Sequence, residues 1–172
     1  MALNGIDVSG WQSTIDISRV PCDFVIAKAT GRTKLVSSAC DKQIQAAKKA
    51  GNLWGFYHFA REKGYGASTA EAEAKYFVKN CKNYFGSGVP VLDFEQDVAS
   101  CGVTWAKTFL DTVHYSVSKN IVKVALIIKI LIETAPGNIC LFNNTVDAYF
   151  IKWYSVKFCF NGLVNSFPFC FR

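Results

Sequence analysis

Two acidic residues stand two positions apart in the segment Asp93-Phe94-Glu95, directly after the apolar run 89–92. On a β-strand, residues i and i+2 lie on the same face with their Cα atoms about 7 Å apart. Carboxylates this close raise each other's pKa, so one can stay protonated while the other stays charged. Hydrolysis of a glycosidic bond uses such a division, with an acid at the leaving oxygen and a negative group near the oxocarbenium-like centre. The alternative is a pair of solvated acids at a strand end.

Three earlier apolar runs also end in side chains that could do chemistry. These side chains are Asp7 in the first run, Lys28 and Thr30 in the second, and Tyr57 and His58 in the third. The carboxyl ends of parallel strands meet at one edge of a sheet, where the active sites of such folds lie. Asp7 would lie beside the Asp93–Glu95 pair if the sheet curls into a barrel. Three acids at separate strand positions favour a site over solvated side chains.

Several of these residues allow two interpretations. His58 follows Tyr57 on a strand, so the two point to opposite faces, and His58 is either a hydrogen-bonded core residue or a catalytic base. Trp11, which follows the first strand together with Gln12, either stacks on a sugar ring or belongs to the core. Lys28 on an apolar strand is costly to bury alone. It is therefore expected to pair with one of the acids, in a site or in a structural ion pair.

The elements that must position these residues alternate along the first 118 residues. Strands are expected at 4–9, 23–30, 53–59 and 89–95, and helices at 37–50, 68–81 and 103–118. Ser68 and Glu71 form the predicted capping box of the second helix, and Gly51 is the predicted C-cap of the first. Strands that alternate with helices predict parallel βαβ units with right-handed crossovers. The predicted fold class is therefore α/β.

Residues 119–172 have a different composition. They hold 6 basic and 2 acidic residues, a net charge of +4, whereas residues 1–118 hold 13 and 11, a net charge of +2 out of +6. They also contain seven of the 14 Phe but only two of the 12 Gly. Segments 122–132 and 148–160 could form strands, but no helical periodicity links them. The predicted division is a site-bearing part at 1–118 and a divergent tail at 119–172 that replaces or completes the fold.

Composition excludes several classes of protein. An apolar fraction of 51% with 19% charged residues rules out a disordered chain. The seven Cys show no CxxC or Cys/His spacing, so a structural zinc site is not expected. The cysteines are expected to be mostly reduced, buried thiols. The run 121–132 is too short and too charged to span a membrane. The basic tail lacks the patterned face that nucleic-acid binding requires.

Four motifs occur in order along the first 95 residues: Gly5-Ile-Asp-Val-Ser-Gly-Trp-Gln12, Phe24-Val-Ile-Ala-Lys-Ala-Thr30, Ala50-Gly-Asn-Leu-Trp-Gly-Phe-Tyr-His-Phe59 and Pro90-Val-Leu-Asp-Phe-Glu95. Together they resemble family 25 glycoside hydrolases, the lysozymes (N-acetylmuramidases) of bacteria and phages. The resemblance implies an irregular (β/α) TIM-like barrel, with the first four β/α units recognisable and the acids at its C-terminal face. It also implies cleavage of the β-1,4 bond between N-acetylmuramic acid and N-acetylglucosamine in peptidoglycan.

Carried over by position, Glu95 resembles the general acid of the family. Asp93 resembles its partner, which either stabilises positive charge or orients the substrate's N-acetyl group for intramolecular attack, and Asp7 the acid that completes the cluster. Tyr57 resembles an aromatic residue that lines the saccharide groove. The expected substrate-binding residues are Tyr57, Trp11, Gln12, Lys28 and His58. No cofactor or metal is expected, and the choice between a two-carboxylate and a substrate-assisted mechanism stays open.

Two features depart from the family pattern. Gly31-Arg32 follows Lys28-Ala-Thr30, where the family usually has Glu-Gly. The later family motifs do not align with 119–172, whose composition resembles AT-rich DNA translated in a wrong frame. The resulting hypothesis is a frameshifted or truncated lysozyme, whose missing strands would leave open sheet edges. The alternative functions are a non-catalytic remnant that at most binds cell-wall glycan, and a membrane-active basic tail on an inactive domain.

The resemblance also sets expectations for partners and location. The expected partner is the glycan strand of peptidoglycan, with no nucleic acid and no stable membrane insertion, and the chain is expected to be a monomer. The N-terminus shows no basic, apolar and small-residue succession typical of a secretory signal. The chain is therefore expected to be made in the cytoplasm and to reach the wall at lysis, as phage endolysins do.

Overall fold

The computed structural model describes residues 3–62, 64–94, 98–117, 125–127, 152–160 and 163–171. Its eight strands are β1 (Leu3–Val8), β2 (Phe24–Gly31), β3 (Leu35–Val36), β4 (Leu53–Phe59), β5 (Val89–Asp93), β6 (Ala125–Ile127), β7 (Lys152–Phe160) and β8 (Leu163–Phe171). The four strands expected in the first 118 residues correspond to β1, β2, β4 and β5, with ends that differ by at most two residues.

The strands form one sheet in the order β6-β5-β4-β2-β1-β7-β8, with β3 paired to β2. All pairs are parallel except β2–β3 and β7–β8. The α/β class with parallel strands is therefore confirmed. Within the described residues the sheet is open, with β6 and β8 at its two ends, so the expected barrel is not confirmed.

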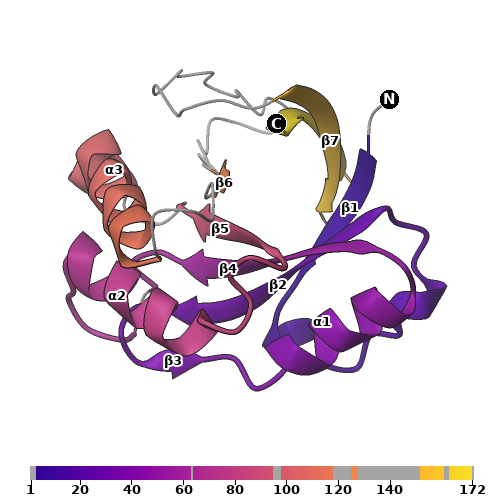
Figure 1. Cartoon of the computed structure of the whole chain (residues 1–172), viewed down its shortest axis with the longest axis horizontal. Helices are drawn as coiled ribbons and strands as arrows, with labels where there is room; N and C mark the ends of the chain where they lie inside the picture. The colour runs from indigo at the N-terminus through magenta and orange to yellow at the C-terminus, as the bar shows by residue number, and fades with distance from the viewer. Residues whose placement is uncertain are drawn as a thin grey trace.

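In the part of the chain that the structure describes, three α-helices cover one face of the sheet. They are α1 (Cys40–Lys49), α2 (Ala70–Cys81) and α3 (Val98–Ser116). Figure 1 shows α1 and α2 beneath the sheet and α3 beside α2. Gly51 has a φ of +78° just after α1, which confirms its predicted place at the helix end. The backbone of α3 leaves helical geometry at Gly102, so the helix expected from residue 103 is the part after this kink.

The start of α2 corrects the predicted capping box. Thr69 is the N-cap, and its hydroxyl accepts a hydrogen bond from the Ala72 N–H at 3.2 Å. The hydroxyl of Ser68 instead donates to the carboxylate of Glu73. The cap therefore lies one residue later than predicted, because Ser68 is engaged in a buried polar network that the local sequence does not reveal.

The strands bury different residues on their two faces, because successive side chains point to opposite sides of the sheet. The larger apolar cluster fills the space between sheet and helices, with Phe56 of β4, Phe77 of α2 and Phe109 of α3 fully buried. A smaller cluster lies on the opposite face and consists of Phe24, Ile26, Tyr57 and Val91, with Leu3, Phe59 and Val89 packed against it. The sheet thus has a helix face and an opposite face, and the candidate site residues divide between them.

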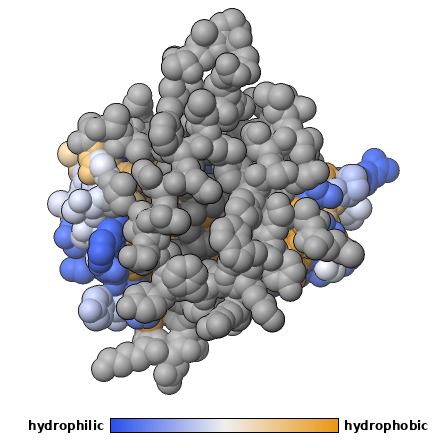
Figure 2. Space-filling view, turned by 90° about the horizontal axis from the view of Figure 1, so that it is seen from above, coloured by the Kyte–Doolittle hydropathy of each residue, from blue (hydrophilic) through white to orange (hydrophobic). Residues whose placement is uncertain are grey.

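The strands expected within the tail are confirmed in part. β6 lies in the segment 122–132 and pairs with β5, and β7 lies in the segment 148–160 and pairs with β1. The remainder of these two segments lies outside the described residues. On the flanks that Figure 2 colours, hydrophilic side chains stand beside small apolar areas. Among the described residues no helix has the length and apolar character to cross a membrane.

Candidate functional site

Strand register brings four of the predicted site residues to the opposite face. Lys28 pairs with Tyr57, which belongs to the apolar cluster of that face. Asp7 pairs with Ile26 of the same cluster, and Asp93 pairs with Phe59, which packs against that cluster. Because paired residues of neighbouring parallel strands share a face, all four side chains lie on the side away from the helices. This face is the candidate site.

The structure describes two of the three predicted catalytic acids, Asp93 and Asp7. Asp93 is buried at the end of β5, and Asp7 is half-buried near the end of β1. Asp7 is level with Val89, so Asp93 lies four residues, or about 13 Å, further along the strand direction. Such a stagger accompanies strand tilt in closed sheets, whereas the sheet of the described residues is open. Glu95 lies outside the described residues.

A β-bulge in β2 re-aims the residues that follow Lys28. The register shifts between Lys28 and Thr30, so that Thr30 pairs with His58 and Gly31 with Phe59. Ala29 and Thr30 are both buried on the helix face, whereas Gly31 joins the row of Phe59 and Asp93. A bulge of this kind, next to a site, returns the following residue to the opposite face.

Lys28 forms an ion pair, as expected, and the partner that the described residues provide is Glu62, which was not among the predicted acids. The Nζ of Lys28 lies 2.6 Å from Oε1 of Glu62, and the two side chains are 12% and 20% exposed. The Lys28 ammonium also lies 4.7 Å from the centre of the Phe59 ring. Because the pair is largely desolvated, removing either partner would leave a poorly solvated charge.

His58 points to the helix face, opposite to Tyr57, as its position predicts. Its ring is fully buried and stacks on Phe109 at 5.0 Å between ring centres. Its Nδ1 lies 2.8 Å from the Thr30 hydroxyl and its Nε2 lies 2.8 Å from Oε2 of Glu73. The interpretation as a hydrogen-bonded core histidine is confirmed. The expected contact of His58 with substrate does not fit this arrangement. Both ring nitrogens are hydrogen-bonded to Thr30 and Glu73, and the ring lies on the helix face of the sheet.

The charges of His58 and Glu73 follow from their surroundings. Burial lowers the pKa of His58 and outweighs the opposing effect of Glu73, so the ring is neutral at pH 7. Burial raises the pKa of Glu73, but hydrogen bonds from His58, Ser68 and the Arg61 N–H outweigh it, and the net pKa lies below the usual value. Glu73 is therefore a carboxylate that accepts from the Nε2–H of His58. Nδ1 then accepts from the hydroxyl of Thr30.

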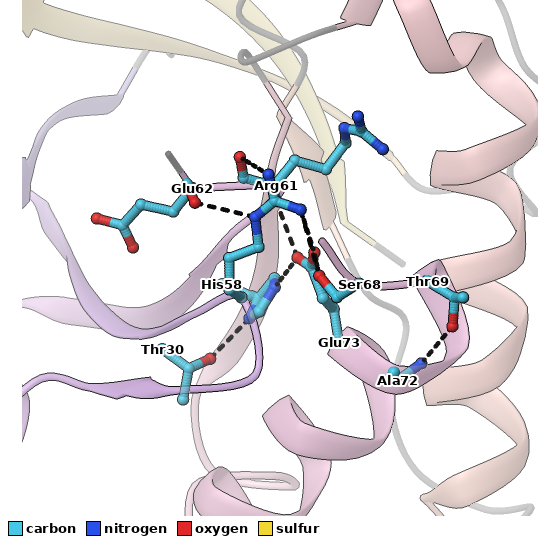
Figure 3. Close-up of polar contacts among 9 residues, drawn as sticks. Thr30, His58, Arg61, Glu62, Ser68, Thr69, Ala72 and Glu73 are labelled. Carbon is cyan, nitrogen blue, oxygen red and sulfur yellow. Dashed lines mark hydrogen bonds and ion pairs between the residues drawn. The ribbon is translucent and has the colours of Figure 1, made fainter. Parts of the chain in front are cut away.

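Arg32 joins this network to the segment between β4 and α2. Its Nη1 lies 3.7 Å from Oε1 of Glu73, and its Nε and Nη2 donate to the carbonyl oxygens of Glu62 and Arg61 at 2.9 and 2.8 Å. The Arg61 N–H donates to Oε2 of Glu73 at 2.9 Å. Figure 3 shows His58, Arg61 and Ser68 gathered around Glu73 at the start of α2. The network thus fixes the backbone that carries Glu62 to the opposite face.

Sequence reasoning missed Glu62, Arg32 and Glu73. Glu73 did carry a signal, because it lies on the stripe of α2 that buries Ala70, Ala74, Phe77 and Cys81. A carboxylate on the buried stripe of an amphipathic helix requires a partner inside the protein. Glu62 and Arg32 lie in irregular segments and carried no comparable signal.

Trp11 and Gln12 lie in the 3₁₀ turn η1 (Gly10–Gln12) that follows β1. Trp11 is 94% exposed, so the interpretation as a core residue is wrong. The side-chain oxygen of Gln12 accepts from the Ser9 N–H at 3.0 Å and closes the turn. The buried Gln43 of α1 donates to the Ser9 and Gln12 carbonyl oxygens at 2.8 and 3.3 Å. The exposed indole is thereby carried on a turn fixed from below.

The described residues include no cluster of three His, Cys, Asp or Glu that could hold a metal ion. Cys22, Cys40 and Cys81 are free thiols, in line with the expected reduced state. Burial raises the pKa of the Cys40 thiol to about 12, so this thiol stays protonated and unreactive at neutral pH.

The chain matches one protein family over most of its length. The sequence profile described as Glycosyl hydrolases family 25 matches residues 6–123, which include every predicted site residue. The N,O-diacetylmuramidase of Arthroderma benhamiae is 25% identical over 169 residues, which cover 90% of this chain and 69% of that protein.

Solved structures give the same result for the fold. A muramidase from Acremonium alcalophilum is 33% identical with a TM-score of 0.52, over 65% of this chain and 60% of that one. The lysozyme from Streptomyces coelicolor is 28% identical with a TM-score of 0.57, over 74% of this chain and 63% of that one. The chain therefore spans less than two thirds of either structure.

Proposed function

Because the chain belongs to glycosyl hydrolases family 25, we propose that it hydrolyses the β-1,4 bond between N-acetylmuramic acid and N-acetylglucosamine in cell-wall peptidoglycan. The observation that carries the proposal is the shared face of Asp7, Tyr57 and Asp93 at the carboxyl end of the parallel strands. The muramidase and lysozyme names of the relatives support the same substrate.

In the proposed reaction Glu95 protonates the glycosidic oxygen as the bond to the anomeric carbon breaks. Asp93 stabilises the positive charge that develops on the sugar ring, or orients the N-acetyl oxygen to attack the anomeric carbon. Water then completes the hydrolysis and returns the proton to Glu95. Burial of Asp93 supports this role, since a carboxylate acts more strongly on a developing charge in a water-poor site. Asp7 completes the acidic cluster.

The proposed glycan groove runs along the opposite face of the sheet. Tyr57 supplies an aromatic wall within it, and Trp11, 94% exposed, supplies a stacking surface beyond the end of β1. In this proposal the sheet curves as an irregular, incomplete barrel, the enzyme works as a monomer, and it meets its substrate at the cell wall. Net charge adds little support, since most of it lies in residues 119–172.

A second candidate is glycan binding without turnover. It is favoured by the extent of the family match, which covers residues 6–123 and leaves most of the divergent tail unmatched. A tail that does not rebuild the family's catalytic apparatus beside the groove would let the chain bind peptidoglycan and leave it intact.

The test is lysis of purified cell walls, followed as the fall in turbidity, by the parent chain and by Glu95→Gln. Replacing the general acid is expected to slow clearing by a factor of about 10² to 10⁴. Equal clearing by both chains would contradict the role of Glu95. If the folded parent chain does not clear the cell walls and instead sediments together with insoluble peptidoglycan, the second candidate is favoured.

A further inference from the structure

A carboxylate that the sequence analysis did not single out lies on the candidate site face. A Cβ added to Gly31 would overlap Oε2 of Glu62 and lie 3.1 Å from its Cδ. Gly31 pairs with Phe59, and Phe59 pairs with Asp93, so the three positions form one row. The Glu62 carboxylate therefore occupies the place of the missing side chain at the carboxyl end of β2, two strands from Asp93.

Only one of the two Glu62 oxygens has a partner. Oε1 lies 2.6 Å from Nζ of Lys28, whereas Oε2 is buried and has no hydrogen-bond partner in the described part of the chain. A buried acceptor without a donor costs free energy. Figure 3 shows the carboxylate directed away from Glu73, so the network beneath the sheet does not supply this donor.

The backbone at Glu62 is held firmly enough to keep the acceptor in place. The guanidinium of Arg32 donates to the Glu62 carbonyl at 2.9 Å and is itself anchored by Glu73. Residue 31 is glycine, so no side chain at that position competes with the Glu62 carboxylate, which reaches it from the segment after β4.

We propose that Glu62 is a glycan-binding residue, with Oε2 accepting a hydrogen bond from a hydroxyl or acetamido N–H of the bound saccharide. This inference rests on the proposed function, since it adds a contact to the same groove. An uncharged donor fits best, because Lys28 already balances the carboxylate charge and would repel a cation. Sugar hydroxyls and N-acetyl amides are uncharged donors that peptidoglycan offers at every ring. Lys28, packed over Phe59, holds the carboxylate for this contact.

The experiment measures binding rather than turnover. The Glu95→Gln chain serves as a parent that does not cut its ligand, and the probe is a tetrasaccharide of alternating N-acetylglucosamine and N-acetylmuramic acid. Adding Glu62→Ala is expected to weaken the calorimetric affinity about tenfold or more, since a hydrogen bond to a charged acceptor is lost. Adding Gly31→Ala instead is also expected to weaken the affinity. The new methyl group displaces the Glu62 carboxylate from its place, while the charge of Glu62 is retained.

Glu71→Ala is the matched control, because it removes an exposed carboxylate of α2 and should leave affinity unchanged. Glu62→Gln replaces Glu62→Ala if the latter fails to fold, and its weaker neutral acceptor is expected to reduce affinity several-fold. Parent-like affinity in the folded Glu62 variant overturns the inference alone. Failure of the Glu95→Gln parent to bind the tetrasaccharide overturns the proposed function and this inference together.

Discussion

Tyr57 and His58 are adjacent in the chain, yet Tyr57 faces the candidate groove and His58 faces the core. Alternation along a strand makes this division predictable from sequence, and the structure follows it. The identity of the His58 partners was not predictable, because Glu73 lies 15 residues away on another element. The same holds for Lys28, whose need for a partner follows from its apolar neighbours but whose pairing with Glu62 depends on the path of an irregular segment.

The exposed indole of Trp11 permits a prediction at the residue scale. Trp11→Ala is expected to raise KM for soluble glycan roughly 5- to 30-fold, as loss of about 1–2 kcal/mol of aromatic contact would do, with little change in kcat. The free energy of unfolding should change by less than about 0.5 kcal/mol, since the side chain contributes almost nothing to the core. Steady-state kinetics and urea unfolding measure the two quantities.

Tyr115 is the matched control for Trp11, because it is an aromatic residue with 85% exposure on α3, away from the candidate groove. Tyr115→Ala should leave KM unchanged. An equal rise of KM in both variants, or none in Trp11→Ala, would remove Trp11 from the groove.

At the scale of elements, the strands and helices of the first part were largely predictable, and two details were not. The bulge in β2 depends on how Thr30 and His58 meet across strands. The cap of α2 moves from Ser68 to Thr69 because Glu73 and Arg32 engage the Ser68 hydroxyl. Both details arise from contacts distant in sequence, which local patterns do not encode.

The buried network that joins β2, β4 and α2 predicts how stability depends on pH. Burial lowers the pKa of His58 below its unfolded value of 6.5, so the unfolded chain binds more protons as the pH falls through that value. The free energy of unfolding should therefore fall from about pH 7.5 to about 5.5. Protonation of Glu73, whose pKa is also lowered, adds a further loss below about pH 4.5.

His58→Asn tests this origin. The variant is expected to lose about 1–3 kcal/mol of stability at pH 7, because Glu73 loses a buried donor. It should also show a shallower decline of stability between about pH 7.5 and 5.5 in urea unfolding. His114→Asn, which changes the exposed second histidine, should keep the parent's decline. A decline as steep in His58→Asn as in the parent would assign the effect to other groups.

For the whole molecule, the adjacency of the first strands was predictable from the sequence. Which strands pair with the outer strands β5 and β1 was not. Parallel βαβ units place β1, β2, β4 and β5 side by side from local signals alone. Nothing in the composition of residues 119–172 indicates that β6 pairs with β5 and β7 with β1. The division of the chain at residue 118 stays a prediction, and these two pairings determine how it can be tested.

A chain ending at Val117 lacks β6, β7 and β8, so it exposes the backbone edges of β5 and β1. Unpaired edges of a sheet with apolar strands recruit other edges, and the short chain is expected to self-associate. Light scattering after size-exclusion chromatography measures this, and a chain ending at Ile127, which keeps β6 and frees only the β1 edge, should associate less. A chain ending at Val117 that is monomeric and has the parent's free energy of unfolding would contradict the expectation. Residues 1–117 would then form a core that is stable without the strands of the tail.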